Sequence, residues 1–320
     1  MQKPYTIKKA FTMLELIFVI VILGIVSSIG SGIIANVFES YIIQRAVHDG
    51  GIKTELAINQ LANRLTYRID KTMIARESNQ TTPTYTFPPK ANPTAYAARE
   101  LPTGKVDTHK ALEWIGYDND HFSAYKVPTW SGFADLNQST YNSLSTPGSS
   151  TQRFSKIYAG PKERAIRFMG TSDYASGPTD YYSVNCMYKK KGCMFPISVP
   201  KKNATKEPRF KFLTSGDRGK GKMIYTEFYQ LASSAFAIVP ENAHTLANTS
   251  VEVHDLVFYY GYQPWLGEHY KDGSRAVLLK NVSVFRFRKD ANAIRLKICS
   301  VERIGDQQTI SICKEKAVIR

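Results

Sequence analysis

A nearly uncharged run close to the start of the chain limits the folds open to it. Residues 11–38 read FTMLELIFVIVILGIVSSIGSGIIANVF and carry one charge, that of Glu15. At ~1.5 Å per residue these 28 residues span ~42 Å as a helix, against ~30 Å for the hydrocarbon core of a bilayer. We therefore predict a transmembrane helix. An ionisable group at membrane depth costs up to ~3 kcal/mol and normally marks a function, so Glu15 is a candidate functional residue.

Three lysines before this run set its expected orientation. Lys3, Lys8 and Lys9 occur with no acid among the first ten residues. The positive-inside rule then predicts a single membrane span with a cytoplasmic N-terminus and with everything after Phe38 outside the cytoplasm. A secretory signal has an apolar centre of about 7–15 residues and a small-residue cleavage site, whereas this run is longer and continues into a helical pattern. The alternative to a helix that is processed by a peptidase is a membrane anchor that stays uncleaved.

Residues 39–76 continue the run as an amphipathic helix. Apolar residues recur at helical spacing, and Lys53, Glu55 and Arg68 are among the polar residues between them. A helix over residues 11–76 would reach ~99 Å, and Gly50 and Gly51 are its expected weak point or bend. The apolar face needs a cover, which we expect from the later strands. The apolar positions are Ile42, Ile43, Val47, Ile58, Leu61, Leu65, Ile69 and Met73.

The rest of the chain has the composition of a strand-rich body. Of the 320 residues 43% are hydrophobic, with 19 Tyr and 16 Phe, which is enough for a sizeable core. Tyr and Phe occur in short runs separated by Gly and Pro, a pattern that favours strands over helices. The net charge of +15 favours an anionic partner or surface but does not specify a fold.

Residues 77–150 are rich in Pro, Ser, Thr and Asn. Trp114, Trp130 and several tyrosines interrupt the polar stretches, so we expect an ordered variable region with two or three strands, of which ALEWIGY is the clearest. Asn79 and Asn137 each lie in an Asn-x-Ser/Thr glycan-acceptor pattern, with an acidic residue two positions earlier, as bacterial periplasmic glycosylation prefers. Chance explains such short patterns unless the source organism has that pathway.

Residues 151–320 predict an antiparallel β domain. Short runs separated by turns alternate apolar with polar residues, so we expect one face of the sheet to be buried and the other to be exposed to solvent. Examples are RAIRFMG, KMIYTEFYQLA, SAFAIVP and AVLLKNVSVFRFR. The pattern favours a meander. The clearest hairpin is the last one, where two runs flank Gly305 and Asp306.

The four cysteines are expected to form disulfides. None of them forms a CxxC pair, and an even count behind a membrane segment fits an oxidising compartment, with free thiols in a reducing cytosol as the alternative. Cys299 and Cys313 lie seven residues on either side of Asp306 and would face each other across the hairpin. We therefore predict the most local pairing, Cys299–Cys313 and Cys186–Cys193.

No motif in the sequence predicts catalysis, a cofactor or a metal site. The histidines include no HExxH and no i,i+4 pair, and GxSxG, P-loop and GxGxxG motifs are absent. We expect the chain to have no enzymatic activity and to bind no cofactor or metal. The six histidines are His48, His109, His121, His244, His254 and His269.

A basic region is the best candidate for a ligand surface. Residues 186–222 contain eleven Lys or Arg and two acids, a net charge of +9, with Phe195, Phe210 and Phe212 among them. Contact with a nucleic-acid backbone and base stacking is one interpretation, and a solvated loop is the other and the favoured one. The candidate DNA contacts are Lys189, Lys190, Lys191, Lys201, Lys202, Arg209 and Lys211.

The stretch AFTMLELIFVIVILGIV resembles the class III prepilin signal of type IV pilins and type II secretion pseudopilins. Their pattern is a short basic leader, a small residue, then Phe-Thr-x-x-Glu and an apolar helix. The resemblance implies that prepilin peptidase removes residues 1–10 by cutting between Ala10 and Phe11 and methylates the new amino group of Phe11. Ala10 stands where the family usually has glycine. Glu15 would then be the fifth mature residue, which in this family pairs with the amino terminus of a neighbouring subunit.

The remainder of the chain is similar, more loosely, to J-type pseudopilins and PilW-like minor pilins. The retained Glu15 argues against the K-type tip subunit, which lacks that glutamate. The resemblance implies an α+β minor pilin or pseudopilin that primes or joins a filament of a type IV pilus, a type II secretion system or a DNA-uptake pseudopilus. Its partners would be other pilin subunits, prepilin peptidase and the inner membrane. The alternative is a single-pass anchored periplasmic binding protein or enzyme ectodomain.

Overall fold

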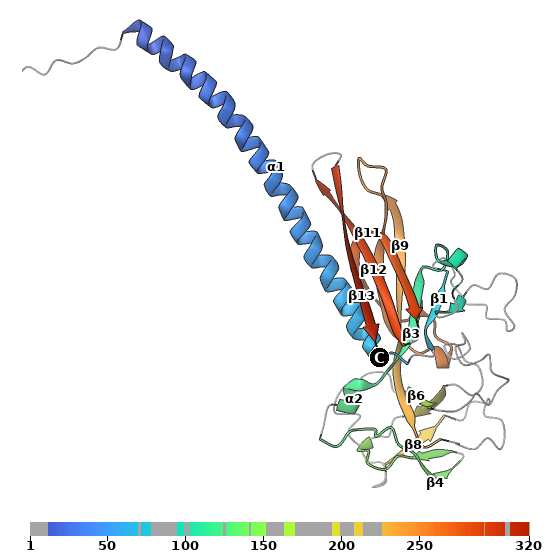
Figure 1. Cartoon of the computed structure of the whole chain (residues 1–320). Coiled ribbons are helices and arrows are strands. Elements are labelled where there is room, and N and C mark those ends of the chain that lie inside the picture. Colours follow the sequence, from blue (N-terminus) through green and yellow to red (C-terminus); the bar gives the residue numbers. More distant parts are fainter. Residues whose placement is uncertain are drawn as a thin grey trace, which may run out of the picture.

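The chain forms one long helix and one large antiparallel sheet, which confirms the predicted α+β class (Figure 1). The computed structural model describes residues 12–69, 72–77, 95–98, 101, 103–123, 126–140, 142–151, 163–169, 194–198, 208–213, 226–290, 292–304 and 308–319. Helix α1 is Met13–Thr66, and a short helix α2 is Asn119–Ser123. The strands are β1 (Ile74–Arg76), β2 (Ala95–Ala97), β3 (Ala111–Tyr117), β4 (Asp135–Thr140), β5 (Ser143–Ser145), β6 (Glu163–Phe168), β7 (Phe195–Ser198), β8 (Arg209–Phe212), β9 (Tyr229–Thr245), β10 (Glu252–Tyr262), β11 (Ser274–Asp290), β12 (Ala293–Ile304) and β13 (Gln308–Ile319).

The last five strands form the predicted meander. Strands β9 to β13 are neighbours in chain order and every pair is antiparallel. Phe285 and Phe287 are buried while Arg286 and Arg288 are exposed, as their alternation predicts. One prediction is wrong: KMIYTEFYQLA and SAFAIVP are not two strands, because the 17 residues of β9 run on as one, pairing with β10 on one edge and with β6 and then β3 on the other.

The terminal hairpin has the predicted register. Residues of β12 and β13 pair without a shift from Ala293 opposite Ile319 to Ile304 opposite Gln308. This register sets Cys299 opposite Cys313, and their sulfurs are bonded at 2.10 Å with Cα atoms 4.0 Å apart. The predicted Cys299–Cys313 disulfide is present. Cys186 and Cys193 lie outside the described residues.

The amphipathic helix ends ten residues earlier than expected, at Thr66 rather than at residue 76. Beyond it the backbone bonds to β3 instead of continuing its own helix: the Ile69 amide donates to the Ile115 carbonyl (2.7 Å) and the Tyr117 amide to the Tyr67 carbonyl (2.9 Å). The expected last helical turn is strand β1, which pairs with both β2 and β3. Bonds to the sheet therefore replace helical ones, and tertiary contact overrides the local pattern.

Residues 77–150 contribute more to the sheet than expected. The structure describes four strands there, β2 to β5, where two or three were predicted. ALEWIGY is β3, buried along most of its length between β1 and β9. One hydrophobic cluster lies between the sheet and the C-terminal part of α1, a second is formed mainly by β3, β9 and β10, and a third by residues of β5 to β9.

Candidate functional site

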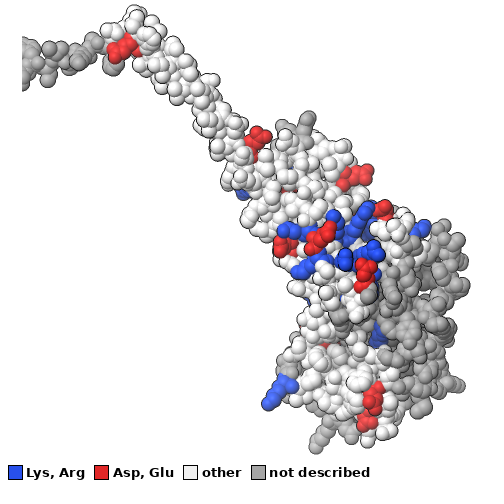
Figure 2. Space-filling model, in the orientation of Figure 1, with Lys and Arg blue, Asp and Glu red and all other residues white. Residues whose placement is uncertain are grey.

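Helix α1 consists of two segments with opposite environments. We call residues 13–49 the outer segment and residues 50–66 the inner segment. No residue of the outer segment is buried, and its large apolar side chains, apart from the half-buried Ile43, are between 41% exposed (Val47) and 86% exposed (Met13). Figure 1 shows it projecting beyond the sheet, and Figure 2 shows it nearly free of charged side chains. At ~1.5 Å per residue it is ~56 Å long, so by length and composition α1 can cross a membrane once.

Thr12 begins the helix and Glu15 lies in its first turn. Thr12 has an extended backbone, and its hydroxyl accepts a hydrogen bond from the Glu15 amide (3.3 Å), so it is the N-cap. Glu15 is exposed, and no described residue binds its carboxylate. A negative charge in the first turn is favourable because the helix dipole is positive there. Ala10 and Phe11, the predicted cleavage residues, lie outside the described residues.

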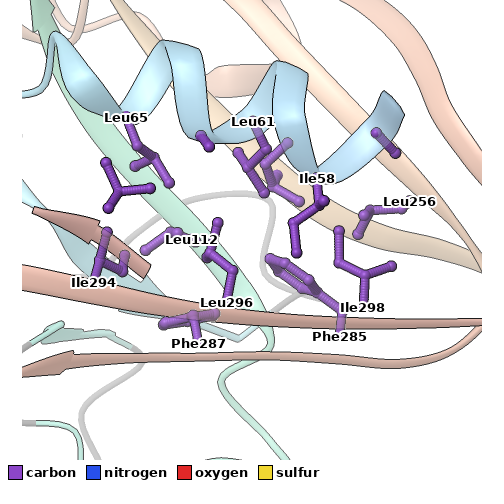
Figure 3. Packing of buried hydrophobic residues seen from close by; sticks show 14 of the residues in the cluster. Ile58, Leu61, Leu65, Leu112, Leu256, Phe285, Phe287, Ile294, Leu296 and Ile298 are labelled. Carbon is purple, nitrogen blue, oxygen red and sulfur yellow. The ribbon is translucent and has the colours of Figure 1, made fainter. Parts of the chain in front are cut away.

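The inner segment packs on the sheet with one apolar face (Figure 3). Ile58, Leu61 and Leu65 contact a layer of side chains from β3, β10, β11 and β12, which include Phe285 and Leu296. The predicted cover for this face is therefore confirmed. Each fully buried Leu or Ile contributes about 1.5–3 kcal/mol relative to exposure, so this face fixes the helix to the body.

Polar contacts flank the apolar face of the inner segment. The Thr54 hydroxyl lies 2.6 Å from that of Ser300, and both residues are buried. Lys53 pairs with Glu302 (3.1 Å), and Lys314 of β13 pairs with Glu55 (3.0 Å). These ion pairs are exposed and screened by solvent, so they contribute little to stability.

The boundary between the two segments is a close contact at Gly50. A weak point or bend was expected at Gly50 and Gly51, and α1 continues as a helix through both residues. Gly50 is buried, and a Cβ there would lie 2.5 Å from Cδ1 of Ile312 and 2.8 Å from Cγ of Glu302, whereas a Cβ on Gly51 would meet nothing within 4 Å. Gly50 therefore lets the helix approach the end of the hairpin, and Gly51 has no such role.

An aromatic cavity of about 580 Å³ lies beside the end of α1 and was not predicted from the sequence. The rings of Phe236 and Phe258 stack with centroids 5.7 Å apart, and those of Phe258 and Tyr260 are 5.6 Å apart. The Arg64 guanidinium lies 5.8 Å from the Phe236 centroid. The lining has no carboxylate, histidine, cysteine or lysine, so it offers ring faces and one cation but no acid–base pair.

A buried ion pair joins β1 to β3 and was also missed. Arg76, expected at the helix end, lies in β1 and donates to Glu113 at 2.6 Å, and both side chains are sealed from water. Tyr262 donates to the second Glu113 oxygen (3.2 Å), and the Arg76 guanidinium lies 2.7 Å from Nε2 of His269. Burial, together with the neighbouring Arg76 charge, lowers the pKa of His269 to about 4. The cluster ties the chain after the helix to the sheet.

A second buried cluster surrounds Asp118, the residue after β3. One carboxylate oxygen lies 2.7 Å from Nδ1 of His121, and the other accepts from Nε of Arg164 at 3.0 Å. The Asp118 carbonyl accepts from the Trp130 indole (2.8 Å). These contacts hold α2, β6 and the loop at residue 130 together. Among the described residues, no three His, Cys, Asp or Glu side chains gather as a metal site would require.

The structure describes only part of the predicted basic surface. Arg209 and Lys211 lie in β8; the Arg209 guanidinium donates to the Gln138 carbonyl (2.6 Å), and Lys211 is exposed. Phe210 and Phe212 are buried in the core, so the suggestion that they stack on bases is wrong. Alternation along β8 turns both rings inward. The remaining candidates lie outside the described residues: Lys189, Lys190, Lys191, Lys201 and Lys202.

Comparison with known proteins identifies no relative. No family model matches the chain, and neither a curated protein nor a solved structure is significantly similar to it. The arguments that follow therefore depend on the sequence and on the geometry described above.

Proposed function

We propose that the chain is a minor pilin or pseudopilin subunit. Prepilin peptidase would remove residues 1–10 and methylate Phe11. The outer segment would then lie first in the inner membrane and later among the helices of other subunits, in a type IV pilus or in a secretion or DNA-uptake pseudopilus. The sheet domain would remain on the periplasmic side, and the J-type and PilW-like minor subunits are the proposed relatives.

The exposed outer segment is the observation that carries the proposal. The architecture is pilin-like, with a long N-terminal apolar helix packed on an antiparallel sheet through its C-terminal part. Apolar surface left in water costs about 25 cal/mol per Å², so the exposed helix from residue 13 to residue 38, whose only charge is Glu15, requires another environment. A membrane and the core of a helical filament both provide one.

Glu15 distinguishes assembly from simple anchoring. It is the only charge between residues 13 and 38, and no described residue binds its carboxylate. A permanent anchor gains nothing from a carboxylate that costs up to ~3 kcal/mol at membrane depth. In the proposed filament, the free amino group of a neighbouring Phe11 would neutralise it. The competing function, a single-pass anchored periplasmic binding protein or enzyme, gives Glu15 no role.

The N-terminal peptide of the protein isolated from membranes tests this function. We expect a peptide that begins at Phe11 and carries one N-methyl group, and a full-length chain in cells that lack prepilin peptidase. Glu15→Gln is the matched variant, since it removes the charge and keeps the shape. It should retain the helix and lose incorporation into sheared filaments. An intact Met1, or a cut beyond residue 38, would contradict the proposal.

A further inference from the structure

Strand β4 carries a bulge that lifts Asn137 away from the sheet. The register pairs Asp135 with Ser145 and then Thr140 with Ser143, so residues 136–139 stand opposite the single residue Leu144. β4 is the last strand of its path through the sheet, and Figure 1 shows it at the opposite end of the body from the outer segment of α1. Among the described strands none pairs with the outer side of β4, so the bulge lies at an edge of the described sheet, away from the surfaces that bind the helix.

Hydrogen bonds give the bulge a defined shape. Oδ1 of Asp135 accepts from the amides of Asn137 (2.9 Å) and Gln138 (3.1 Å). The Ser139 hydroxyl donates to the Asp135 carbonyl, and the Arg209 guanidinium donates to the Gln138 carbonyl from β8. This contact gives Arg209 a structural role in the bulge.

Two groups that a glycosyl transfer requires, the Asn137 carboxamide and one Asp135 carboxylate oxygen, have no partner among the described residues, and a third, the Ser139 hydroxyl, is engaged. Asn137 is exposed, and its carboxamide binds no other described residue. Oδ2 of Asp135 has no hydrogen-bond partner within the described ranges, so a cationic group of an enzyme can bind it. The Ser139 hydroxyl is engaged with Asp135 and with the Ser145 amide (3.0 Å), and these bonds must open during the reaction. Opening at an exposed sheet edge costs little free energy.

We propose that Asn137 is an N-glycosylation site for an oligosaccharyltransferase that requires an acidic residue two positions before the asparagine. The donor is an oligosaccharide on a polyprenyl diphosphate. Nδ2 of Asn137 forms a bond to C1 of the first sugar, the bond from C1 to the diphosphate oxygen breaks, and Nδ2 loses one proton while the polyprenyl diphosphate leaves. The inference rests on the periplasmic location in the proposed function, but not on cleavage or assembly.

The chain contains a matched comparison site at Asn248. The tripeptide Asn248-Thr-Ser is also an acceptor sequence, and Asn248 is exposed in a turn with a positive φ of 61°. Its carboxamide has no hydrogen bond to the described part of the chain, but Leu246 occupies the position that Asp135 occupies before Asn137. Asn248 should therefore stay unmodified, although it is as accessible as Asn137.

The test is glycopeptide mass spectrometry on the full chain, produced in bacteria with and without an acid-dependent oligosaccharyltransferase and its lipid-linked donor. We expect occupancy at Asn137 only with the enzyme. Asp135→Asn, which keeps the Oδ1 acceptor, should reduce occupancy to the enzyme-free level, as should Ser139→Ala. Leu246→Asp should create occupancy at Asn248, which is unmodified in the parent chain.

The Cys299–Cys313 disulfide, read from the same digest without reduction, separates two kinds of failure. If it is oxidised and Asn137 is unmodified, the glycosylation proposal is overturned and the periplasmic location stands. If both cysteines are reduced and Asn137 is unmodified, the location is wrong and the glycosylation proposal fails with it. Occupancy that persists in Asp135→Asn would overturn the acid-dependent mechanism.

Discussion

The two segments of α1 differ in what surrounds them, although they form one uninterrupted helix. In the outer segment no residue is buried, and from residue 13 to residue 38 apolar residues occur all around, whereas in the inner segment one face is buried and the other carries Lys53 and Glu55. A helix that is apolar all round is adapted to lipid or to other helices, and a one-sided helix is adapted to the surface of a sheet. The outer segment is therefore the part of the described molecule whose apolar surface is not covered by the sheet.

Substitutions of two leucines in the inner segment, one buried and one exposed, should give the largest difference in the free energy of unfolding. Leu61→Ala should destabilise the folded domain by about 3–5 kcal/mol, because Leu61 is buried against the sheet and its removal leaves a cavity. Leu56→Ala, on the exposed face, should change stability by less than about 0.5 kcal/mol. Urea unfolding of both variants in detergent measures this difference. Equal losses would mean that the helix does not pack as described.

The disulfide should stabilise the hairpin on which the inner segment lies. Cys299 and Cys313 are separated by 14 positions, and closing a loop of this size stabilises a fold by about 2–3 kcal/mol. The double variant Cys299→Ser, Cys313→Ser should lose this amount in urea unfolding while the outer segment keeps its helicity. The parent chain under reducing conditions is the control. A loss of outer-segment helicity in the double variant would contradict the independence of the two segments.

Acid should lower the stability of the folded domain through His269, which lies beside Arg76 in the chain after the inner segment. The pKa of His269 is about 4 in the folded state and ~6.5 in the unfolded chain, so only the unfolded state gains a proton as the pH falls from 6.5 to 4. Stability from this group is therefore complete above pH 6.5 and falls below it, by about 1–2 kcal/mol after solvent screening. His269→Gln should flatten this part of the profile. Parallel profiles for parent and variant would contradict the assignment.

The smallest difference is expected at the two glycines between the segments. Gly51→Ala should stabilise the helix by about 1 kcal/mol, because nothing lies near the new methyl group. Gly50→Ala should gain less or lose stability, because Ile312 and Glu302 must move. Thermal unfolding of the two variants side by side measures the contrast. A similar gain at both positions would show that the helix does not approach the hairpin at Gly50.

Local patterns in the sequence predicted the parts of the fold that depend on neighbours in the chain. The apolar run predicted the outer segment. The equal spacing of Cys299 and Cys313 from Asp306, seven residues on each side, predicted the register that joins them, because a hairpin is local. The spacing of Ile58, Leu61 and Leu65 predicted the buried face for the same reason.

Features that depend on distant segments were missed. Ile69 and Met73 fit helical spacing and are buried, but the backbone there bonds to β3 and to Ala98 instead of continuing the helix, and periodicity alone cannot separate the two cases. Arg68 was expected among the polar residues of the helix, but it is fully buried. Its guanidinium donates to the carbonyl of Leu65 and to the carbonyl of Asn292, which is 224 positions away. The Arg76–Glu113 pair also joins separate elements. No local pattern contains that information.

Site-specific photocrosslinking in living cells tests the central claim most directly. A photoreactive residue at Ile33 of the outer segment should crosslink to other pilin-like subunits when prepilin peptidase is present, and Glu15→Gln should abolish these products. The same residue at Ile58 should crosslink only within the chain, because the sheet covers that position. Absence of intermolecular products at Ile33 in cells that cleave the leader would contradict the account, because the outer segment would then be an anchor and no more.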